Sequence, residues 1–266
     1  MNRFRRLLRP LAFIGAACAL LVVLGFVEHS ARRTPVTDLQ VEVEGAAGVH
    51  FIDQEAVRAK VLAAHTGLIG AAVSEVDITA IENDLRNIGC VAKADVYHTM
   101  DGKLHIRVAQ REPIARVINA DGTGFYIARD GSTMPLSTEH TARVLVFTGP
   151  LHEPFSTQVT DLEAMDDSLT AATHSLRMLR VARTIVADPL WNALFEQVVL
   201  DAEGGFELIP RVGLQRIRIG TGEQLAQRLE KLRTFYHQGI AQTDWRRYSV
   251  IDLRFGDQVV CTKRTL

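Results

Sequence analysis

Cysteine is scarce in this sequence, with Cys18, Cys90 and Cys261 the three present in 266 residues. None of them forms a Cys-x-x-Cys pair, so the sequence contains neither a zinc knuckle nor a dithiol redox motif. A disulfide between Cys90 and Cys261 would have to join two different predicted domains. The formal net charge of -1 lacks the concentrated basic excess that nucleic-acid-binding proteins usually carry. We therefore expect no nucleic-acid partner.

Recognisable catalytic and metal motifs are also missing. The sequence has no Gly-x-Ser-x-Gly elbow, and its nine histidines include no His-Glu-x-x-His or His-x-His group. His98 and His105 flank a predicted hairpin turn and are expected to be exposed. Neighbouring carboxylates such as Asp166 and Asp167 point in different directions on a helix, which favours a solvated face. We expect a protein that is not an enzyme and has no cofactor and no metal; a membrane-tethered hydrolase is the alternative.

Two glycines lie between Arg218 and Leu225, where an alternating run meets a helical run, as in the first turn of a dinucleotide-binding fold. That fingerprint requires a third glycine at position 225, and Glu223 would put a carboxylate where the pyrophosphate should lie. We predict instead a capping box, in which Thr221 caps the next helix while Gln224 reaches back. The glycines therefore do not indicate a phosphate site.

An uncharged run of 17 residues occupies positions 11–27, preceded by four arginines within residues 1–10. At about 1.5 Å per residue, the run and its flanks can cross roughly 30 Å of hydrocarbon as one helix. Only Arg32 and Arg33 follow closely, so the positive charges place residues 1–10 in the cytoplasm and the bulk of the chain outside. The sequence predicts a single-pass membrane protein.

A cleaved signal peptide is the main alternative to a membrane span. Its apolar core would be shorter and would end in a small-x-small site, whereas this run continues to Glu28 without a good one. Cys18 lies in the middle of the run, so we interpret it as an apolar residue of the span and not as a lipidation site. An ordinary buried helix would not be apolar all round behind a cluster of arginines.

Residues 36–111 show patterns in the order strand, helix, helix, strand, strand. The predicted strands cover residues 39–45, 91–97 and 103–108. Asp53 and Asp77 precede the two helical patterns and are predicted N-caps. This order predicts a small α+β unit in which two helices cover one face of a three-stranded sheet.

Residues 112–266 form a second predicted domain, which is rich in β structure and contains two helices. Short apolar runs between turn residues predict strands at 114–118, 124–128, 142–148, 195–201, 206–210, 214–219, 248–254 and 258–263. The two predicted helices cover residues 169–187, ended by Asp188-Pro189, and residues 224–238. The predicted fold class is α+β throughout.

This order of parts resembles the FtsQ/DivIB family of bacterial cell-division proteins. In that family a basic cytoplasmic tail and a single transmembrane helix precede a POTRA unit and a β domain. Residues 108–137, 204–235 and 248–264 resemble the family's passages at the domain junction, at the hairpin before the last helix and at the closing strands. Ala128 stands where many relatives carry an acidic residue. Residues 87–91, which include Cys90, differ from the family's usual sequence at the end of the second POTRA helix.

The resemblance implies a non-enzymatic scaffold of the divisome, the complex that controls septal peptidoglycan synthesis. Family members lie in the cytoplasmic (inner) membrane at the septum, and their exported part holds single-span coiled-coil proteins of the FtsB and FtsL types. Their POTRA unit lies next to the membrane and is associated with septal recruitment. The alternative is another POTRA-containing component of envelope assembly or export, which would bind a substrate polypeptide.

The resemblance also implies where the partners dock. The closing strands of the β domain would leave one unpaired edge, which can accept a strand from a partner. By position in the family's motif, the residues expected at that edge are Arg254, Phe255, Asp257 and Val259.

Overall fold

The computed structural model describes residue 19 and residues 34–46, 48, 50–99, 101–239, 247–256 and 258–264. The predicted cytoplasmic tail and, apart from residue 19, the predicted span at 11–27 lie outside these residues. Within the described part of the chain, no helix is both long and apolar enough to cross a membrane. The chain divides into two compact units, one built on residues up to Glu44 and Ile52–Ala109, the other on Gly45–Phe51 and Gln110–Leu266.

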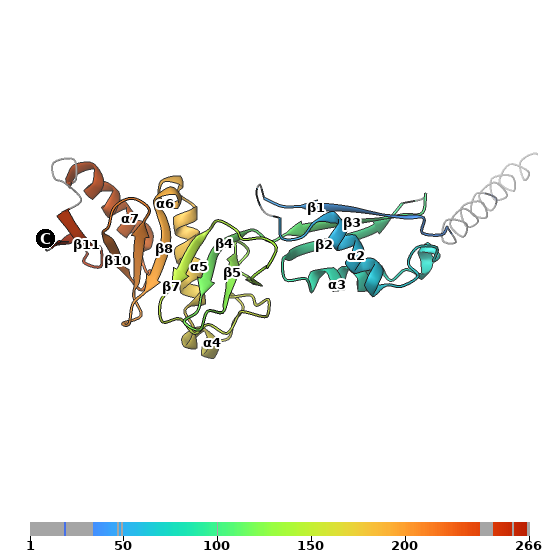
Figure 1. Ribbon diagram of the computed structural model, residues 1–266, viewed down its shortest axis with the longest axis horizontal. Helices are drawn as coiled ribbons and strands as arrows, with labels where there is room; N and C mark the ends of the chain where they lie inside the picture. The colour runs from blue at the N-terminus through green and yellow to red at the C-terminus, as the bar shows by residue number, and fades with distance from the viewer. Residues whose placement is uncertain are drawn as a thin grey trace, which may run out of the picture. The chain divides into compact units, whose positions relative to one another are not determined.

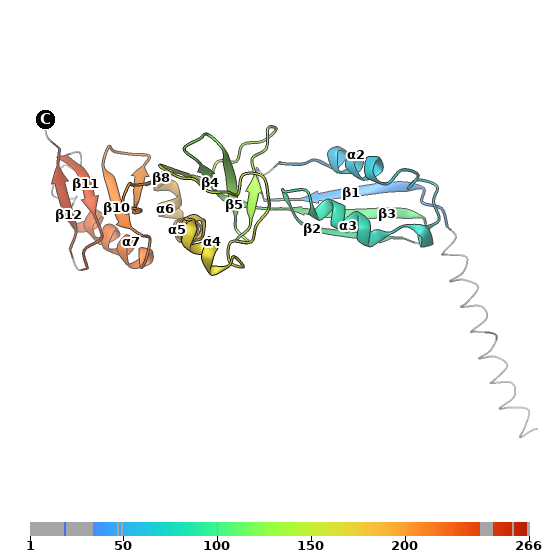
Figure 2. The same ribbon diagram turned by 90° about the horizontal axis from the view of Figure 1, so that it is seen from below.

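The first unit has the predicted order strand, helix, helix, strand, strand (Figures 1 and 2). Its elements are β1 (Asp38–Glu44), α2 (Gln54–Ala64), the 3-10 turn η1 (Val73–Glu75), α3 (Ile78–Arg86), β2 (Val91–His98) and β3 (Lys103–Gln110). The strand order is β1-β3-β2, with β1 parallel to β3. Val57 and Val61 of α2 and Leu85 of α3 pack in one core with the buried side chains of the sheet, so both helices cover the same face.

Both predicted N-caps of the first unit are confirmed. The Asp53 carboxylate accepts a hydrogen bond from the Ala56 backbone N–H at 2.7 Å, and the Asp77 carboxylate accepts one from the Ala80 N–H at 2.9 Å. Each cap satisfies a helix N–H that has no partner within the helix. These short polar contacts explain why the two helices begin where the sequence predicts.

The second unit is built on a nine-stranded sheet. Its strands are β4 (Pro113–Ile118), β5 (Gly124–Ala128), β6 (Thr133–Pro135), β7 (Leu145–Thr148), β8 (Phe195–Leu200), β9 (Phe206–Pro210), β10 (Arg216–Gly220), β11 (Tyr248–Asp252) and β12 (Val260–Lys263). They follow the order β12-β11-β10-β9-β8-β7-β4-β5-β6, and the pairs β4·β7, β7·β8 and β10·β11 are parallel. The short strand β6 was not predicted from the sequence.

Among the described residues, four helices and one π turn accompany this sheet, where two helices were predicted. They are α4 (Asp167–Ala172), α5 (Ser175–Val186), α6 (Pro189–Leu194), α7 (Leu225–Thr234) and η2 (Phe235–Gly239). Figure 2 shows them along one side of the strands. Met178 of α5 and Leu229 of α7 share a core with Phe147, Val198 and Ile217 of the strands, all of them fully buried. The second unit is therefore a layer of helices on a largely antiparallel sheet.

The prediction of a single helix over residues 169–187 is wrong, because the chain is extended at Thr173. The Thr173 hydroxyl donates to the Leu169 carbonyl at 2.9 Å and closes α4. The buried Glu153 carboxylate accepts from the backbone N–H groups of His174 (2.8 Å) and Ser175 (3.1 Å), where α5 begins. A carboxylate from a distant loop thus supplies the cap, and the sequence around the helix contains no sign of it.

The predicted capping box is also wrong. Helix α7 begins at Leu225 after Gln224, which has a left-handed φ of 52° and makes no side-chain capping bond. Gly220 and Gly222 have φ of 63° and 87°, a region that favours glycine. A Cβ on Gly222 would lie 2.7 Å from Val181 Cγ2. The two glycines therefore serve a left-handed turn packed against α5.

Because Glu153 satisfies the first turn of α5 from a buried site, its removal should be costly. We expect Glu153→Ala to lower the free energy of unfolding by roughly 2–3 kcal/mol, since it leaves buried N–H groups without an acceptor. Glu153→Gln, which keeps an acceptor, should cost less. Urea unfolding measures both, with the exposed Glu139→Ala as the matched control, expected within about 0.5 kcal/mol of the parent. Equal midpoints for Glu153→Ala and Glu139→Ala would contradict the capping role.

Candidate functional site: the β12 edge of the second unit

The two edge strands of the nine-stranded sheet, β6 and β12, have different surroundings. At one end, β6 is covered by residues 158–162. The Thr133 N–H donates to the Thr160 carbonyl at 2.8 Å, and the Thr160 N–H donates to the Thr133 hydroxyl at 2.8 Å. Arg183 of α5 anchors the neighbouring Glu163 with an ion pair of 2.7 Å. Residues 158–162 therefore engage the backbone N–H and the side chain of Thr133 at this edge of the sheet.

At the other end, β12 pairs with β11 and is the last of the described strands in the order. Its four residues are exposed or half-buried, and the Val260 side chain is 42% exposed. An edge strand presents a row of backbone N–H and C=O groups that another strand can pair with. We call Val260–Lys263 the β12 edge.

An ion pair lies where β11 ends. Asp252 is almost buried, and Arg254 binds it with Nε at 3.0 Å from Oδ1 and Nη2 at 2.8 Å from Oδ2. Burial alone would raise the pKa of Asp252, but the hydrogen bonds and charge of Arg254, with the charge of Arg218, hold that pKa below its ordinary value. The same hydrogen bonds raise the pKa of Arg254. The pair fixes how the chain leaves β11.

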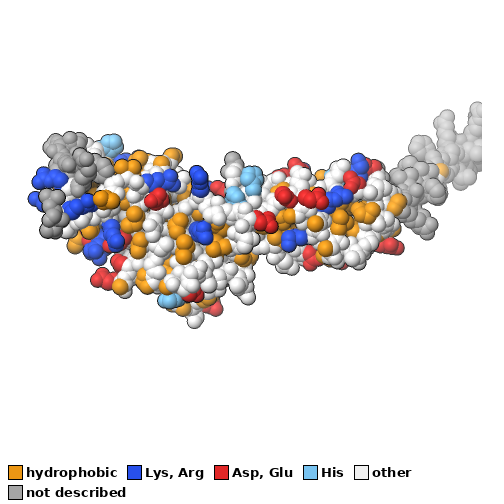
Figure 3. All heavy atoms as spheres, viewed as in Figure 1, with side chains coloured by type: hydrophobic (Ala, Val, Ile, Leu, Met, Phe, Trp, Pro, Cys, Tyr) orange, Lys and Arg blue, Asp and Glu red, His pale blue; other side chains and the backbone are white. Residues whose placement is uncertain are grey.

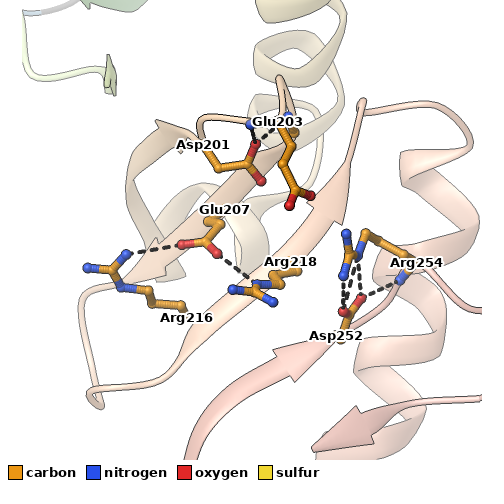
Figure 4. A network of polar contacts seen from close by, with 8 residues as sticks. Asp201, Glu203, Glu207, Arg216, Arg218, Asp252 and Arg254 are labelled. Carbon is orange, nitrogen blue, oxygen red and sulfur yellow. Dashed lines mark hydrogen bonds and ion pairs between the residues drawn. The ribbon is translucent and has the colours of Figure 1, made fainter. Parts of the chain in front are cut away.

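A second set of charges crosses β9 and β10 beside this pair, as Figure 4 shows. The Glu207 side chain is only 5% exposed and lies between Arg216 (3.2 Å) and Arg218 (2.8 Å). Arg218 is opposite Glu207 on β9 and opposite Asp252 on β11. Opposite charges on neighbouring strands stabilise one register and penalise a shift by one residue. These charges therefore hold the last strands in position.

Lys231 of α7 ties the chain after β11 to the helix. Its ammonium group donates to the carbonyls of Leu253 (3.1 Å), Phe255 and Gly256 (2.9 Å). Between α7 and residues 253–256 lies a hollow of about 80 Å³, lined by the cations of Arg228, Lys231 and Arg254 among others. Phe255 lines the same hollow and is 49% exposed.

Of the residues expected at the edge from the sequence, the described ones, Arg254, Phe255 and Val259, all lie between β11 and β12 and not on β12 itself. Arg254 and Phe255 line the hollow beside α7. Val259 is partly buried and packs against the core of the unit, and Asp257 lies outside the described residues. No sequence pattern indicates Lys231 as the residue that orders this loop, because the carbonyls that it binds are backbone groups that any residue provides.

The other candidates from the sequence have ordinary structural roles. His105 stacks on Tyr97 with ring centroids 5.1 Å apart, and Asp166 is the N-cap of α4. Within the described chain, no group of three or more His, Cys, Asp or Glu side chains is arranged to hold a metal ion. Cys90 and Cys261 fall in different units, and burial raises the pKa of the Cys261 thiol.

Comparison with known families places these features in one class of protein. Residues 112–262 match the family model described as "FtsQ/DivIB, C-terminal related", and residues 35–109 match the model of the POTRA-like domain. The first match covers more than half of the chain and extends to Thr262 in β12. The chain belongs to the FtsQ/DivIB family of cell-division proteins.

Two curated relatives are named "Cell division protein FtsQ". The protein of Rhodothermus marinus is 27% identical over 198 residues, which cover 72% of this chain and 67% of the relative. The protein of Salinibacter ruber is 29% identical over 168 residues, which cover 63% of this chain and 62% of the relative. The match to the second relative thus spans less than two thirds of its length.

Removal of the Lys231 ammonium should loosen the loop at residues 253–256 without unfolding the unit. We expect Lys231→Met to speed backbone amide exchange in this loop by about tenfold, the effect of losing about 1.4 kcal/mol of local hydrogen bonding. Lys93→Met, which removes an exposed ion pair with Asp95 in the first unit, is the control. Unchanged exchange at residues 253–256 would exclude this role for Lys231.

Asp252 should make stability depend on acid pH. Its folded-state pKa is lowered, so its contribution to stability is present above the unfolded pKa of about 3.9 and is lost as pH falls through the folded pKa. Asp252→Asn should therefore cost about 1–2 kcal/mol at pH 7 and progressively less below pH 4. Urea unfolding at pH 7 and pH 3 measures this. A difference between parent and variant that stays constant with pH would contradict the assignment.

Proposed function

We propose that this protein is a non-enzymatic, membrane-anchored scaffold of the bacterial divisome. Its exported part binds single-span coiled-coil proteins of the FtsB and FtsL types and so helps to control septal peptidoglycan synthesis. Membership of the FtsQ/DivIB family and the names of the two relatives support a role in cell division. The particular partners are part of the proposal.

The observation that carries the proposal is the contrast between the two sheet edges. Thr133 of β6 is engaged by residues 158–162 through its backbone N–H and its hydroxyl, whereas no described strand lies beyond β12 in the order. Strand addition to such an edge gives affinity through backbone hydrogen bonds and selectivity through alternate side chains. In this proposal the partner contributes a strand next to β12.

The hollow beside α7 supports the same location for the partner. Arg228, Lys231 and Arg254 line it, although Arg254 is already paired with Asp252, and the exposed Phe255 lines it as well. A partner strand that carries a carboxylate and an apolar side chain beyond the edge would match both features. Asp257 and Val259 belong to the proposed contact as neighbours of Phe255 and of β12.

The membrane anchor and the separate roles of the two units are also part of the proposal. Residues 11–27 have the length and apolarity of one span, and the arginines before them favour a cytoplasmic N-terminus. We assign residues 36–111 to recruitment next to the membrane and residues 112–266 to partner docking. Both units would then lie outside the cytoplasmic (inner) membrane, at the division septum.

A matched pair of proline substitutions tests the β12 edge. Cys261 pairs with Ile251 and Thr262 pairs with Val250. The N–H groups of successive strand residues point to opposite sides of the strand. Of the two variants Cys261→Pro and Thr262→Pro, one therefore loses a hydrogen bond to β11, and the other, the outward variant, loses an N–H that faces away from β11. The outward variant should stay folded and lose the partner.

The full chain would be co-expressed with the FtsB- and FtsL-type proteins of the same organism and recovered through a tag. We expect the folded proline variant to recover at least tenfold less of both partners, and Lys93→Met to recover the parental amount. Urea unfolding identifies which proline variant keeps parental stability. Parental recovery by that variant would move the docking site away from β12, and no recovery even by the parent would refute the proposed partners.

A further inference from the structure

The residues that join β9 to β10, positions 211–215, place two aliphatic side chains in solvent. Val212 is 60% exposed and Leu214 is 77% exposed, the two highest values among the large hydrophobic residues of the described chain. Single exposed aliphatic residues are common on protein surfaces, but two on one connection form a local apolar tip. We call Val212 and Leu214 the apolar tip.

The backbone that carries the apolar tip is held at both ends. The Arg211 N–H donates to the Leu194 carbonyl at 2.8 Å, and Gln215 is buried just before β10 begins. Gly213, between the two aliphatic residues, has a φ of 97°, which favours glycine. The aliphatic side chains are thus exposed on an anchored turn and not on a frayed end of the chain.

Basic residues surround the apolar tip. Arg211 and Arg216 flank it in the sequence and are exposed. Arg216 is level with Val250 in the parallel β10·β11 pair, and Tyr248, two residues before Val250, is opposite Lys263. One end of the sheet therefore contains the starts of β10 and β11 and the end of β12. The exposed Arg247 and Lys263 lie at this same end and belong to the basic surround of the apolar tip.

This part of the chain also has a local basic excess. Residues 204–266 contain 11 Lys or Arg and 6 Asp or Glu, whereas residues 110–203 contain 7 and 13. Figure 3 shows several Lys and Arg side chains over the C-terminal strands of the second unit. Of the carboxylates in neighbouring elements, Glu207 binds Arg216 and Arg218, and Asp188 binds Arg233. Glu196 of β8 is exposed and follows Phe195, which pairs with Pro210. The formal net charge of -1 therefore includes an acidic segment, residues 110–203, and a basic segment, residues 204–266.

We propose that the apolar tip and its basic surround form a second contact surface, which docks on an anionic phospholipid membrane. Two aliphatic side chains on a projecting turn enter a lipid interface without a matching groove, which a folded protein partner would have to supply. Lys and Arg at the level of the headgroups add electrostatic attraction to anionic lipid and keep their charges at the phosphates. This surface shares Lys263 with the β12 edge, but its apolar tip lies on a different connection and does not depend on partner binding at that edge.

Spin labels in the full chain, reconstituted into phospholipid vesicles, test the proposal. Val212→Cys carries the label, and Val159→Cys, an exposed valine of the segment that covers β6, is the matched control. Cys18, Cys90 and Cys261 are replaced by alanine in both. The measured quantity is the collision rate of the label with oxygen, which enters lipid, and with a nickel chelate, which stays in water.

We expect vesicles with about one third phosphatidylglycerol to raise the oxygen-to-nickel ratio at Val212→Cys several-fold over pure phosphatidylcholine, and to leave Val159→Cys unchanged. Arg211→Gln with Arg247→Gln should remove most of the increase, because both remove positive charge near the apolar tip. Salt at 0.5 M should do the same, because screening shortens electrostatic attraction to about 4 Å. Leu214→Cys repeats the measurement at the second residue of the tip.

Three results would overturn the proposal. The label at both tip positions could remain as accessible to nickel as the control in anionic vesicles. The same increase could occur in pure phosphatidylcholine, which would exclude recognition of anionic lipid. Shielding could also occur only after the FtsB- and FtsL-type proteins are added, which would make the apolar tip a protein contact. Loss of partner recovery by the proline variants of β12 would leave the lipid result unaffected, so the two proposals fail separately.

Discussion

The structure of the second unit depends on one constraint, the backbone hydrogen bonding of its sheet. Inner strands satisfy their N–H and C=O groups on both sides, whereas the two edge strands of an open sheet do so on one side only. A nine-stranded open sheet has two ends, and each exposes half of a strand's donors and acceptors. At β6 the chain itself provides the missing partners, through Thr160 and the segment around it. At β12 the described chain provides no further strand in the order. The difference gives the molecule one closed end and one end suited to pairing.

The charges near β12 serve the same constraint. A three-residue parallel contact, such as the one between β10 and β11, offers few hydrogen bonds to define its register. Glu207, Arg218 and Asp252 lie opposite one another on three successive strands, so a shift by one residue would separate them. The buried Glu207 carboxylate is tolerated because two guanidinium groups surround it. These charges specify the register of the strands next to the β12 edge.

Much of the fold could be predicted from the sequence, because local patterns define it. Alternating runs gave most strands, and Asp53 and Asp77 marked two helix starts, since a cap acts within three residues of itself. The failures involve contacts between distant residues. The break before α5 depends on Glu153, and the turn before α7 depends on close packing of Gly222 against Val181. For the candidate site, the family motif predicts Arg254, Phe255, Asp257 and Val259 as contacts, and this stays a prediction. The role of Lys231 follows from carbonyl positions that no local pattern encodes.

The parallel pairing of β10 with β11 has a consequence for how the molecule opens. Strands β11 and β12 form a hairpin that joins the rest of the sheet through residues 216–218 and 250–252, supported by Ile251 and Leu253 in the core. If this hairpin opened locally as one unit, the other seven strands would keep their own pairings. A ligand that binds only the attached hairpin must then stabilise it by mass action. Occupancy of the β12 edge and the order of the last two strands are therefore linked thermodynamically, and each raises the population of the other.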